Sequence, residues 1–523
     1  MKNIKQLALI VLLIWALKGD LWAESKKQDQ TKPNIVLFLV DDMGWQDTSV
    51  PFWEKETHFN KRYNTPSMER LADEGMKFTQ AYACAVCSPT RVSLMTGMNA
   101  ARHRVTNWTL RKDKMMVNPP KGLKMPQWNM NGIGVNKELN NAVYTPQPLP
   151  KVLQENGYTT IHCGKAHFGA IGTKAEDPVN IGFTVNIAGH AAGGPATYYG
   201  LENFAKKKPS VWDIPGLEEY HGKDIFLTEA LTREAIKAVD KSVKAEKPFF
   251  LYMAHYAVHA PIMGDKRFEQ KYLDAGLEPV EAKYASLVEG MDKSLGDIMD
   301  YIDEQGLGDN TIIIFMSDNG GLSAHARGGK PHTHNWPLSS GKGSIHEGGI
   351  REPMIVKWPG TVKAKTACDD YLIIEDFYPT ILEMTDVKPL KGECQYIDGI
   401  SFTKQLKGKK GSKKPRSLFW HYPNNWGPHG PGIDTYSAIR KGDWKLIYYY
   451  TDSGFELFNI ENDIGEKENL LLKEQELAKE LAEELSDYLR EVKAQRPTST
   501  ETNKLVPYPD ESLNNPKEHQ YNY

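Results

Sequence analysis

The fold is decided by residues 33–42, which read PNIVLFLVDD. Apolar residues follow one another without a break from Ile35 to Val40, and the run stops at two adjacent aspartates. A run without polar alternation predicts a strand that is buried on both faces, as in the middle of a parallel sheet. Ligands of such sheets bind at the carboxyl ends of the strands, which is where Asp41 and Asp42 stand.

This pair of aspartates indicates a metal site. Two adjacent carboxylates repel each other unless a cation lies between them, and their oxygens suit a hard cation. The pattern returns in residues 311–319, TIIIFMSDN, where a second apolar run is followed by Asp318 and Asn319. A solvated acidic turn is the alternative for either run alone, but the repetition favours the metal.

Further strands and helices alternate along the chain, which predicts an α/β fold with a mostly parallel sheet. The other apolar runs predict strands at 78–83, 158–163, 248–254 and 354–358. Helical spacing of apolar residues predicts helices at 65–75, 149–155, 224–241, 281–304 and 371–384.

The alternation fades beyond about residue 390. Residues 407–416 are a basic linker, and shorter apolar segments then predict an antiparallel meander, followed by a helix and a polar tail. The strands are expected at 418–422, 436–440, 444–450 and 455–460, and the helix at 473–492. We therefore expect a catalytic domain over 24–405 and a smaller α+β subdomain over 406–523.

The N-terminus predicts export. A basic start, an apolar run from Leu7 to Leu17 and a small residue at Ala23 are typical of a secretory signal peptide over residues 1–23. That run is too short to span a bilayer comfortably, and no other stretch approaches membrane length. We expect a periplasmic or secreted protein without a transmembrane segment.

Composition argues against some classes of partner and does not settle how the cysteines pair. Lysine and arginine total 64 against 67 acidic residues, so no overall charge calls for nucleic acid or an anionic membrane. Five cysteines fit no zinc spacing and are few for a disulfide scaffold of this size. A bridge between Cys368 and Cys394 is the favoured pairing, although the pairing stays undetermined.

A cysteine opens the helix predicted after the strand at 78–83. Residues 87–97 read CSPTRVSLMTG, with Ser88 expected as the N-cap and Pro89 at the first helical position. Cys87 would then stand where free N–H groups and the helix dipole favour an anion, and Arg91 adds a positive fork one turn later. A buried cysteine at the start of an ordinary helix is the alternative.

This segment resembles the signature of the formylglycine-dependent type I sulfatases, Cys-x-Pro-x-Arg followed by Thr-Gly. Residues 341–353, GKGSIHEGGIREP, resemble another segment of that family, and His259 before Ala-Pro resembles its His-x-Pro. The resemblance covers nearly the whole mature chain. It implies an alkaline phosphatase-like fold, in which helices flank a mixed, mostly parallel central sheet and a smaller C-terminal α+β domain carries an antiparallel sheet.

The resemblance also implies the residues of the site. Cys87 would be oxidised to formylglycine (3-oxoalanine), whose hydrated form is the nucleophile, with Asp318 as its base. His259, helped by Lys342, would protonate the leaving sugar oxygen, and His167 would take a proton when sulfate is expelled. The metal, calcium or alternatively magnesium, would be held by Asp41, Asp42, Cys87, Asp318 and Asn319. Sulfate would be held by Arg91, Lys165, His167, His259 and Lys342.

Substrate and partners follow by resemblance to exported bacterial carbohydrate sulfatases. We expect a sulfated poly- or oligosaccharide, with a galactose 4-sulfate as in carrageenan as the first candidate and sulfated ulvan or glycosaminoglycan fragments as alternatives. A formylglycine-generating or anaerobic sulfatase-maturating enzyme would modify Cys87. Polar and aromatic residues of the loops are candidates for a sugar subsite: Arg102, His103, Asn107, Trp108, His325, Arg327, His334 and His429, with His421, Asn424 and Trp426 beside them.

Two other functions remain open on the sequence. A phosphate or phosphonate monoester hydrolase of the same superfamily would share the fold, but two-metal phosphatases need further Asp and His ligands, for which no second set aligns. A noncatalytic sulfated-glycan-binding protein would account for the Trp- and His-rich loops, but not for the catalytic set.

Overall fold

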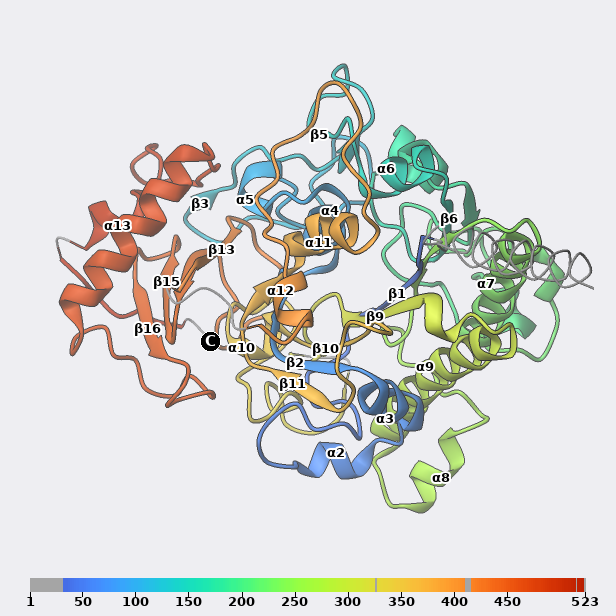
Figure 1. Ribbon diagram of the computed structural model, residues 1–523. Helices are drawn as coiled ribbons and strands as arrows, with labels where there is room; N and C mark the ends of the chain where they lie inside the picture. The colour runs from blue at the N-terminus through green and yellow to red at the C-terminus, as the bar shows by residue number, and fades with distance from the viewer. Residues whose placement is uncertain (1–31, 325–326, 410–414, 514, 522–523) are drawn as a thin grey trace, which may run out of the picture.

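The computed structural model describes residues 32–324, 327–409, 415–513 and 515–521. The predicted signal peptide and His325 lie outside these residues. Figure 1 shows a large central sheet with helices on both faces and a smaller C-terminal sheet beside it. This is the predicted α/β architecture of the alkaline phosphatase-like type.

The central sheet has nine strands in the order β11-β2-β10-β9-β1-β8-β6-β7, with β12 paired to β2. All neighbouring pairs are parallel except those of β10, which runs antiparallel to both β2 and β9. The strands are β1 (Asn34–Val40), β2 (Met76–Tyr82), β6 (Thr159–Gly164), β7 (Val185–Ile187), β8 (Phe249–Ala254), β9 (Thr311–Ser317), β10 (Arg351–Lys357), β11 (Thr366–Cys368) and β12 (Leu372–Ile373).

Strand β1 shows why an unbroken apolar run is needed at the centre. Its alternate side chains point to opposite faces, so Leu37 and Leu39 enter one hydrophobic core while Phe38 and Val40 enter the other. Helices cover both faces, so neither set of side chains meets water. The first core receives α4 (Cys87–Thr96), α6 (Leu149–Glu155) and α11 (Phe377–Met384), and the second receives α3 (Pro66–Glu74), α7 (Leu227–Lys244) and α9 (Pro279–Glu304).

The reversed direction of β10 matters for the site. The parallel strands all end at one edge of the sheet, and β10 begins at that same edge because it runs the other way. The chain between β9 and β10 therefore stays at the edge where ligands bind. This segment includes Lys342 and the short helix α10 (Glu347–Ile350).

The C-terminal sheet is the predicted meander, in the order β13-β14-β15-β16 with antiparallel pairs throughout. Helix α13 (Gln475–Glu491) packs on one side of it, and the other side joins the first core through Trp420 and Tyr436. The strands are β13 (Ser417–Tyr422), β14 (Tyr436–Lys441), β15 (Trp444–Tyr449) and β16 (Phe455–Asn459). The domain boundary at 405/406 stays a prediction.

Smaller elements fill the loops. The long segment after α4 is largely irregular. The tail packs against the protein: β17 pairs with β3, and the backbone of Phe455 bonds Lys517 and His519. These elements are β3 (Leu123–Lys124), β4 (Ile133–Gly134), β5 (Val143–Tyr144), β17 (Thr498–Ser499), α2 (His58–Arg62), α5 (Ala100–His103), α8 (Glu269–Asp274), α12 (Thr403–Leu406) and α14 (Pro509–Ser512).

Two local predictions are wrong. Helix α4 begins at Cys87 itself with Val86 as the N-cap, and the Ser88 hydroxyl instead accepts a hydrogen bond from the Thr109 N–H at 3.1 Å. All five cysteines lie in the described part of the chain and all are free, so Cys368 and Cys394 form no bridge.

Among the described residues, no helix has both the length and the apolar character needed to cross a membrane.

Candidate active site

Four neighbouring parallel strands bring the predicted residues to one edge of the sheet. Asp41 and Asp42 follow β1, and Asp318 and Asn319 follow β9. His259 lies in the loop after β8, while Lys165 and His167 follow β6. The spatial order β9-β1-β8-β6 makes these strand ends adjacent although they are far apart in the sequence.

Each of the three aspartates forms an ion pair with a buried cation. Lys165 Nζ lies 2.7 Å from Asp41 Oδ2, and Lys342 Nζ lies 2.6 Å from Asp42 Oδ1. The guanidinium of Arg91 donates from Nε and Nη2 to Asp318 Oδ2 at 2.9 and 2.8 Å. Three carboxylates thus balance three cations, and a bound divalent cation would leave the site with a net positive charge suited to a sulfate ester.

Burial and charge set the protonation of these carboxyl groups. Burial and the neighbouring Asp318 raise the pKa of Asp41 well above its usual range, against the opposing effect of Lys165. Burial also acts to raise the pKa of Asp42, but Lys342 and His259 outweigh it and hold this pKa below its usual range. Asp42 is therefore ionised, and Asp41 needs a further positive charge to become so.

The donor set fits a hard metal ion. Asp41 Oδ1 and Asn319 Oδ1 are buried and have no hydrogen-bond partner, which is costly unless a cation uses them. The Asn319 Nδ2 atom donates to Asp42 Oδ1 at 2.7 Å, which turns its own carbonyl oxygen away as a free ligand. Buried carboxylate and amide oxygens suit calcium or magnesium.

The side chains whose ligand atoms lie closest together are in part different from the predicted metal ligands. Ligand atoms of Asp41, Asp42 and His259 all lie within 4.8 Å of one another. Asp318 adjoins this group, since its Oδ1 accepts the Asp42 N–H at 3.3 Å. We favour the oxygen donors, because the Oδ1 atoms of Asp41 and Asn319 are buried without a hydrogen-bond partner.

Cys87 stands at the first position of α4 and faces His167. The distance from Cys87 Sγ to His167 Nδ1 is 3.3 Å, and His167 Nε2 lies 2.7 Å from the Thr109 carbonyl oxygen. A carbonyl can only accept, so Nε2 carries the hydrogen and Nδ1 presents its lone pair to residue 87. Burial and the nearby Lys165 lower the pKa of His167 well below 6.5, which keeps it ready to accept a proton.

His259 has the opposite arrangement of ring nitrogens. Its Nδ1 donates to the Ala260 carbonyl oxygen at 2.6 Å, so Nε2 faces the site, 3.7 Å from Asp42 Oδ2. Burial and then Lys342 lower the pKa of His259 to about 3. A negatively charged substrate placed beside Nε2 would raise it again.

A loop from the C-terminal side of β9 delivers Lys342. Its backbone N–H donates to the Gly321 carbonyl oxygen, and the next N–H, of Gly343, donates to the Ala85 carbonyl oxygen at 2.8 Å. Burial acts to lower the pKa of Lys342, but Asp42 and Cys87 raise it above its ordinary value. Lys342 is therefore a permanent cation between the aspartate and residue 87.

These groups form the floor of a pocket of about 320 Å³. Cys87, His167, His259 and Lys342 line it together with three tryptophans from separate parts of the chain. The remaining walls are mostly apolar. The tryptophans are Trp108, Trp212 and Trp426, and the other lining residues are Val86, Val117, Gly193, Ala260, Leu322 and Pro428.

Arg91 and Lys165 do not line this pocket, in contrast to the sulfate-binding role expected for them. The Arg91 side chain is fully buried, and its remaining donor, Nη1, bonds the Lys165 carbonyl oxygen at 2.9 Å. Both residues hold an aspartate in place.

Four of the residues expected in the sugar subsite have structural partners instead. Arg102 pairs with Asp398, and the ring of His103 lies between the Ser93 hydroxyl and the Val105 N–H. His334 Nε2 is 2.6 Å from the Gly328 carbonyl oxygen. Arg327 is the fourth; its guanidinium bonds Glu281, Asp47 and Tyr63.

Among the predicted sugar ligands that the structure describes, Trp108 alone lines the pocket. Asn107 stands behind it, with its Oδ1 accepting both the Trp108 N–H and the Tyr422 hydroxyl. His429 is exposed next to Pro428, and His325 lies outside the described residues. Of the three extra candidates, Trp426 lines the pocket, while His421 and Asn424 are buried and bond Ser437 and Thr106.

Sequence reasoning missed several contributors to the site. Trp212 and Gly193 lie in a segment without a recognised motif, and the dipeptide Gly193-Gly194 before a proline was the available signal. Glu352 was also missed; both its carboxylate oxygens are buried without a hydrogen-bond partner, and burial with the nearby Asp318 raises its pKa well above 4.5.

Comparison with known proteins agrees with this geometry. Residues 33–387 match the family model described as Sulfatase, and residues 339–495 match that of N-sulphoglucosamine sulphohydrolase, C-terminal. A protein named Sulfatase from Formosa agariphila is 30% identical, with 97% of this chain and 98% of that protein covered. N-acetylgalactosamine-6-sulfatase of Mus musculus is also 30% identical, over 84% of this chain and 76% of its own length.

A solved structure supports the same comparison. The crystal structure of Ps i-CgsB in complex with k-i-k-neocarrahexaose has a TM-score of 0.67 and 26% identity. The match covers 92% of this chain and 97% of that one.

Proposed function

The chain belongs to the sulfatase family and is a sulfuric ester hydrolase, and on that premise we propose that it acts on a sulfated carbohydrate through formylglycine at residue 87 and one divalent cation. The observation that carries this proposal is the position of Cys87. It stands at the N-terminus of α4, on the floor of the pocket, with its Sγ 3.3 Å from the free nitrogen of His167.

His167 handles the proton at residue 87. Formylglycine would supply a hydrated aldehyde with two hydroxyl groups, one to bond to sulfur and one whose deprotonation re-forms the C=O bond as sulfate leaves, which a thiol cannot provide. The Nδ1 lone pair of His167 points at this position, and the Thr109 carbonyl fixes the ring by accepting from Nε2. His167 can therefore take the proton that leaves residue 87 when sulfate is released.

His259 and Lys342 serve the other side of the ester. The Nε2 atom of His259 faces the site and is the proton donor for the leaving oxygen. The negative sulfate raises its pKa from the low value of the empty pocket, so binding of the substrate itself prepares the acid. Lys342 stays charged and stabilises the negative charge that develops on the oxygens.

The cation would be held by Asp41, Asp42, Asp318 and Asn319, with an oxygen of modified residue 87 completing the set. When bound it would polarise the sulfate oxygens as a Lewis acid. Calcium is the first ion to test and magnesium the second, because the free oxygens of Asp41 and Asn319 are hard, buried and without partners.

The walls of the pocket support a carbohydrate leaving group. Sugar rings carry an apolar face of C–H groups that packs on aromatic rings, and Trp108, Trp212 and Trp426 offer three such surfaces. We propose a galactose 4-sulfate of a galactan as the first substrate to test, because Ps i-CgsB, a structural relative, was crystallised with k-i-k-neocarrahexaose.

Mass spectrometry of the peptide containing residue 87 tests the chemistry. Protein co-produced with a sulfatase-maturating enzyme should carry the aldehyde in place of the thiol, and only that fraction should turn over. Cys87→Ala should lose turnover and keep its melting temperature. Full activity of this variant, or of protein that carries only the thiol, would refute the proposal.

A desulfation screen on defined sulfated galactosides, ulvan fragments and glycosaminoglycan fragments tests the substrate. Trp108→Ala should raise KM for the preferred sugar by about tenfold, in line with the 1–3 kcal/mol typical of aromatic packing. Trp444→Ala, a half-buried tryptophan of the C-terminal sheet, is the matched control and should leave KM unchanged. Equal KM effects in both variants would remove the tryptophans from the sugar site.

We also propose that the protein is exported, to the periplasm or beyond, after cleavage following Ala23. The support is the basic start and short apolar run of residues 1–23. N-terminal sequencing of the mature protein should begin at Glu24, and a retained Met1 would refute export by this route.

A further inference from the structure

We propose that Gly193 and Gly194 position the two catalytic imidazoles separately, Gly193 fixing the ring of His167 and Gly194 that of His259. The inference rests on the roles proposed above for these histidines. It concerns the segment 188–198, which joins β7 to the part of the chain that carries Trp212, and which no sequence motif singles out.

The first observation is the closeness of the glycines to the rings. A Cβ atom on Gly193 would lie 2.5 Å from His167 Cε1 and 2.9 Å from His167 Nδ1. A Cβ atom on Gly194 would lie 2.9 Å from His259 Nδ1 and 3.0 Å from its Cε1. Neither glycine has the left-handed backbone conformation that would by itself call for glycine. The rings are therefore the reason why no side chain fits at either position.

The second observation is that the segment is tied to both histidine loops. The His167 N–H donates to the His190 carbonyl oxygen at 3.3 Å. The Tyr256 hydroxyl donates to the Ala188 carbonyl oxygen at 2.9 Å, and the Tyr198 hydroxyl lies 2.8 Å from the His259 carbonyl oxygen. Both tyrosines are fully buried. These bonds hold the two glycines against the rings, so the contact is built into the fold.

The third observation is that each ring is fixed from two directions. A backbone carbonyl, of Thr109 or of Ala260, accepts from one ring nitrogen and sets its orientation. The glycine backbone then closes one side of the ring, where a larger residue would force it to move. A methyl group on Gly193 would displace the nitrogen that faces Cys87, and one on Gly194 would displace the imidazole that faces Asp42.

The experiment compares Gly193→Ala and Gly194→Ala with aryl sulfates of graded leaving-group acidity, from 4-nitrophenyl to 4-methoxyphenyl sulfate. Displacement of a catalytic group by about 1 Å costs on the order of 100-fold in rate. A good leaving group needs no proton, so Gly194→Ala should lose about 100-fold in kcat/KM on 4-methoxyphenyl sulfate and little on 4-nitrophenyl sulfate. Gly193→Ala should lose turnover on every ester by a similar factor, because release from residue 87 is common to all.

Two control variants, His259→Ala and Gly308→Ala, distinguish an error in the proposed role of His259 from an error in the positioning inference. His259→Ala should show the same leaving-group dependence as Gly194→Ala; without it, the proposed role of His259 is wrong. If His259→Ala shows this dependence and Gly194→Ala loses rate equally on all esters, the positioning inference is wrong. Gly308→Ala should behave as wild type, because its nearest atom, Asp303 Oδ1 at 2.7 Å, ends a half-exposed side chain that can turn away.

A structural measurement decides the question without turnover. Crystal structures of the two variants should show the His167 ring displaced in Gly193→Ala and the His259 ring displaced in Gly194→Ala, each with the other ring in place. Unmoved rings in well-folded variants would overturn the inference. If either alanine variant does not fold, a crystal structure of the unsubstituted protein gives the test, because a histidine ring that stands clear of its glycine would overturn the inference.

Discussion

The role of a polar side chain in this protein depends on the side chains that bond it, as Arg327 shows. Arg327 is predicted from the sequence to contact the sugar, yet its guanidinium packs 3.7 Å from the centre of the Tyr284 ring and bonds two carboxylates and a hydroxyl. The side chain is fully buried. An arginine with all its donors engaged has none left for a sulfated sugar.

Arg327→Met should therefore damage stability and leave substrate binding intact. It leaves Asp47 without its cation, while Glu281 keeps Arg62 at 2.8 Å. Loss of one partner from a buried pair typically costs about 3–5 kcal/mol. Urea unfolding measures this loss, and KM of the folded fraction should not change. Arg233→Gln, at a pair that is largely exposed, should cost less than about 1 kcal/mol. A raised KM for Arg327→Met would return this residue to the substrate site.

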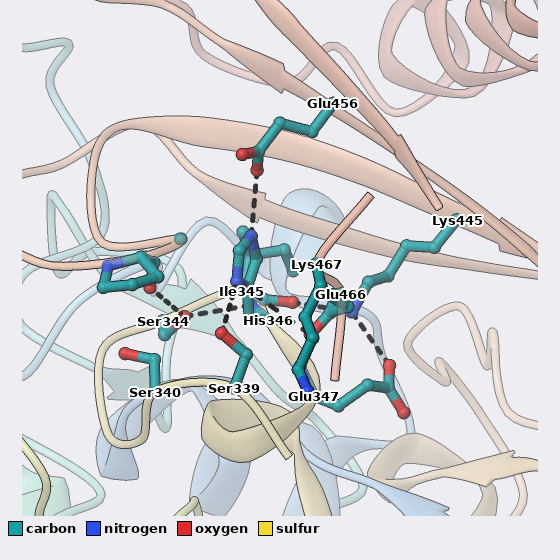
Figure 2. A network of polar contacts seen from close by, with 12 residues as sticks. Ser339, Ser340, Ser344, Ile345, His346, Glu347, Lys445, Glu456, Glu466 and Lys467 are labelled. Carbon is teal, nitrogen blue, oxygen red and sulfur yellow. Dashed lines mark hydrogen bonds and ion pairs between the residues drawn. The ribbon is translucent and has the colours of Figure 1, made fainter. Parts of the chain in front are cut away.

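At the scale of elements, the loop that carries Lys342 is locked to the C-terminal sheet. Figure 2 shows Lys445, from β15, pointing at the segment that follows Lys342. Its Nζ donates to the Ile345 carbonyl oxygen at 3.0 Å and pairs with Glu347 at 2.8 Å and Glu466 at 2.6 Å. The C-terminal sheet thus holds the Lys342 loop in place through Lys445.

Lys445→Met tests this link. The variant takes the lysine from two buried carboxylates and leaves Glu347 with Arg351 alone, at 3.3 Å. We expect a loss of about 3–5 kcal/mol in the free energy of unfolding, mostly from Glu466. We also expect a lower kcat in the enzyme that remains folded, since the backbone at Ile345 is released. Lys441→Met is the control, because Lys441 ends the neighbouring strand β14 and forms a partly exposed pair with Glu484 of α13. The double variant Lys445→Met/Glu466→Gln should be more stable than Lys445→Met, because the unpaired carboxylate is also removed. If the losses in unfolding free energy of the two single variants simply add, the two residues are not coupled.

His346 makes the same junction sensitive to pH. Its Nε2 lies 2.9 Å from Glu456 Oε2 and its Nδ1 lies 2.9 Å from the Ser339 hydroxyl oxygen, as Figure 2 shows. Burial lowers the pKa of His346, but Glu466 and Glu456 outweigh this and raise it above 6.5. The charged imidazole is thus more stable in the folded protein than in the unfolded chain.

The sign of the pH dependence follows from this raised pKa. The folded protein binds the proton more tightly, so the stability due to His346 is complete below pH 6.5 and is lost as the pH rises through the folded pKa. The free energy of unfolding should therefore fall more steeply above pH 6.5 in wild type than in His346→Asn. His221→Asn, at an exposed histidine, should keep the wild-type slope. Parallel curves for wild type and His346→Asn would contradict the prediction.

At the scale of the whole molecule, the proposed cation would connect strand ends that are remote in the sequence. Asp41 and Asp42 follow β1, while Asp318 and Asn319 follow β9, about half the chain later. Burial and then repulsion by Asp318 raise the pKa of Asp41. A cation among them should stabilise the protein as any ligand of the native state does.

Calcium should raise the melting temperature, and a chelator should lower it. At a free concentration 100 times the Kd, about 2.7 kcal/mol of stabilisation is expected. Differential scanning calorimetry in EDTA and in graded calcium or magnesium measures the effect and ranks the two ions. Asp41→Asn should abolish the dependence, while Asp224→Asn, at an exposed ion pair with Lys266, should retain it. A melting temperature indifferent to both ions would remove the metal from the proposal.

The sequence predicts the central strands and the residues that form the floor of the pocket. Apolar runs such as residues 35–40 can be buried on both faces only in a parallel sheet covered by helices, and the carboxyl ends of parallel strands meet at one edge. Asp41, Asp42, Asp318, His167 and Cys87 are adjacent for that reason. The meander and its helix followed from local periodicity in the same way.

The sequence does not predict which polar loop residues face the pocket and which hold the loops together, because the packing of distant segments sets this. Arg102, His103, Arg327 and His334 resemble sugar ligands in the sequence, but each meets a partner brought by another segment. Loop paths depend on contacts between distant parts of the chain, which local patterns do not encode. The same reason explains why the sequence did not predict Trp212 and Gly193 in the pocket, or the bond from Lys445 to Ile345. These contacts form because the chain after β7, the loop after β9 and the C-terminal sheet pack around one edge of the central sheet.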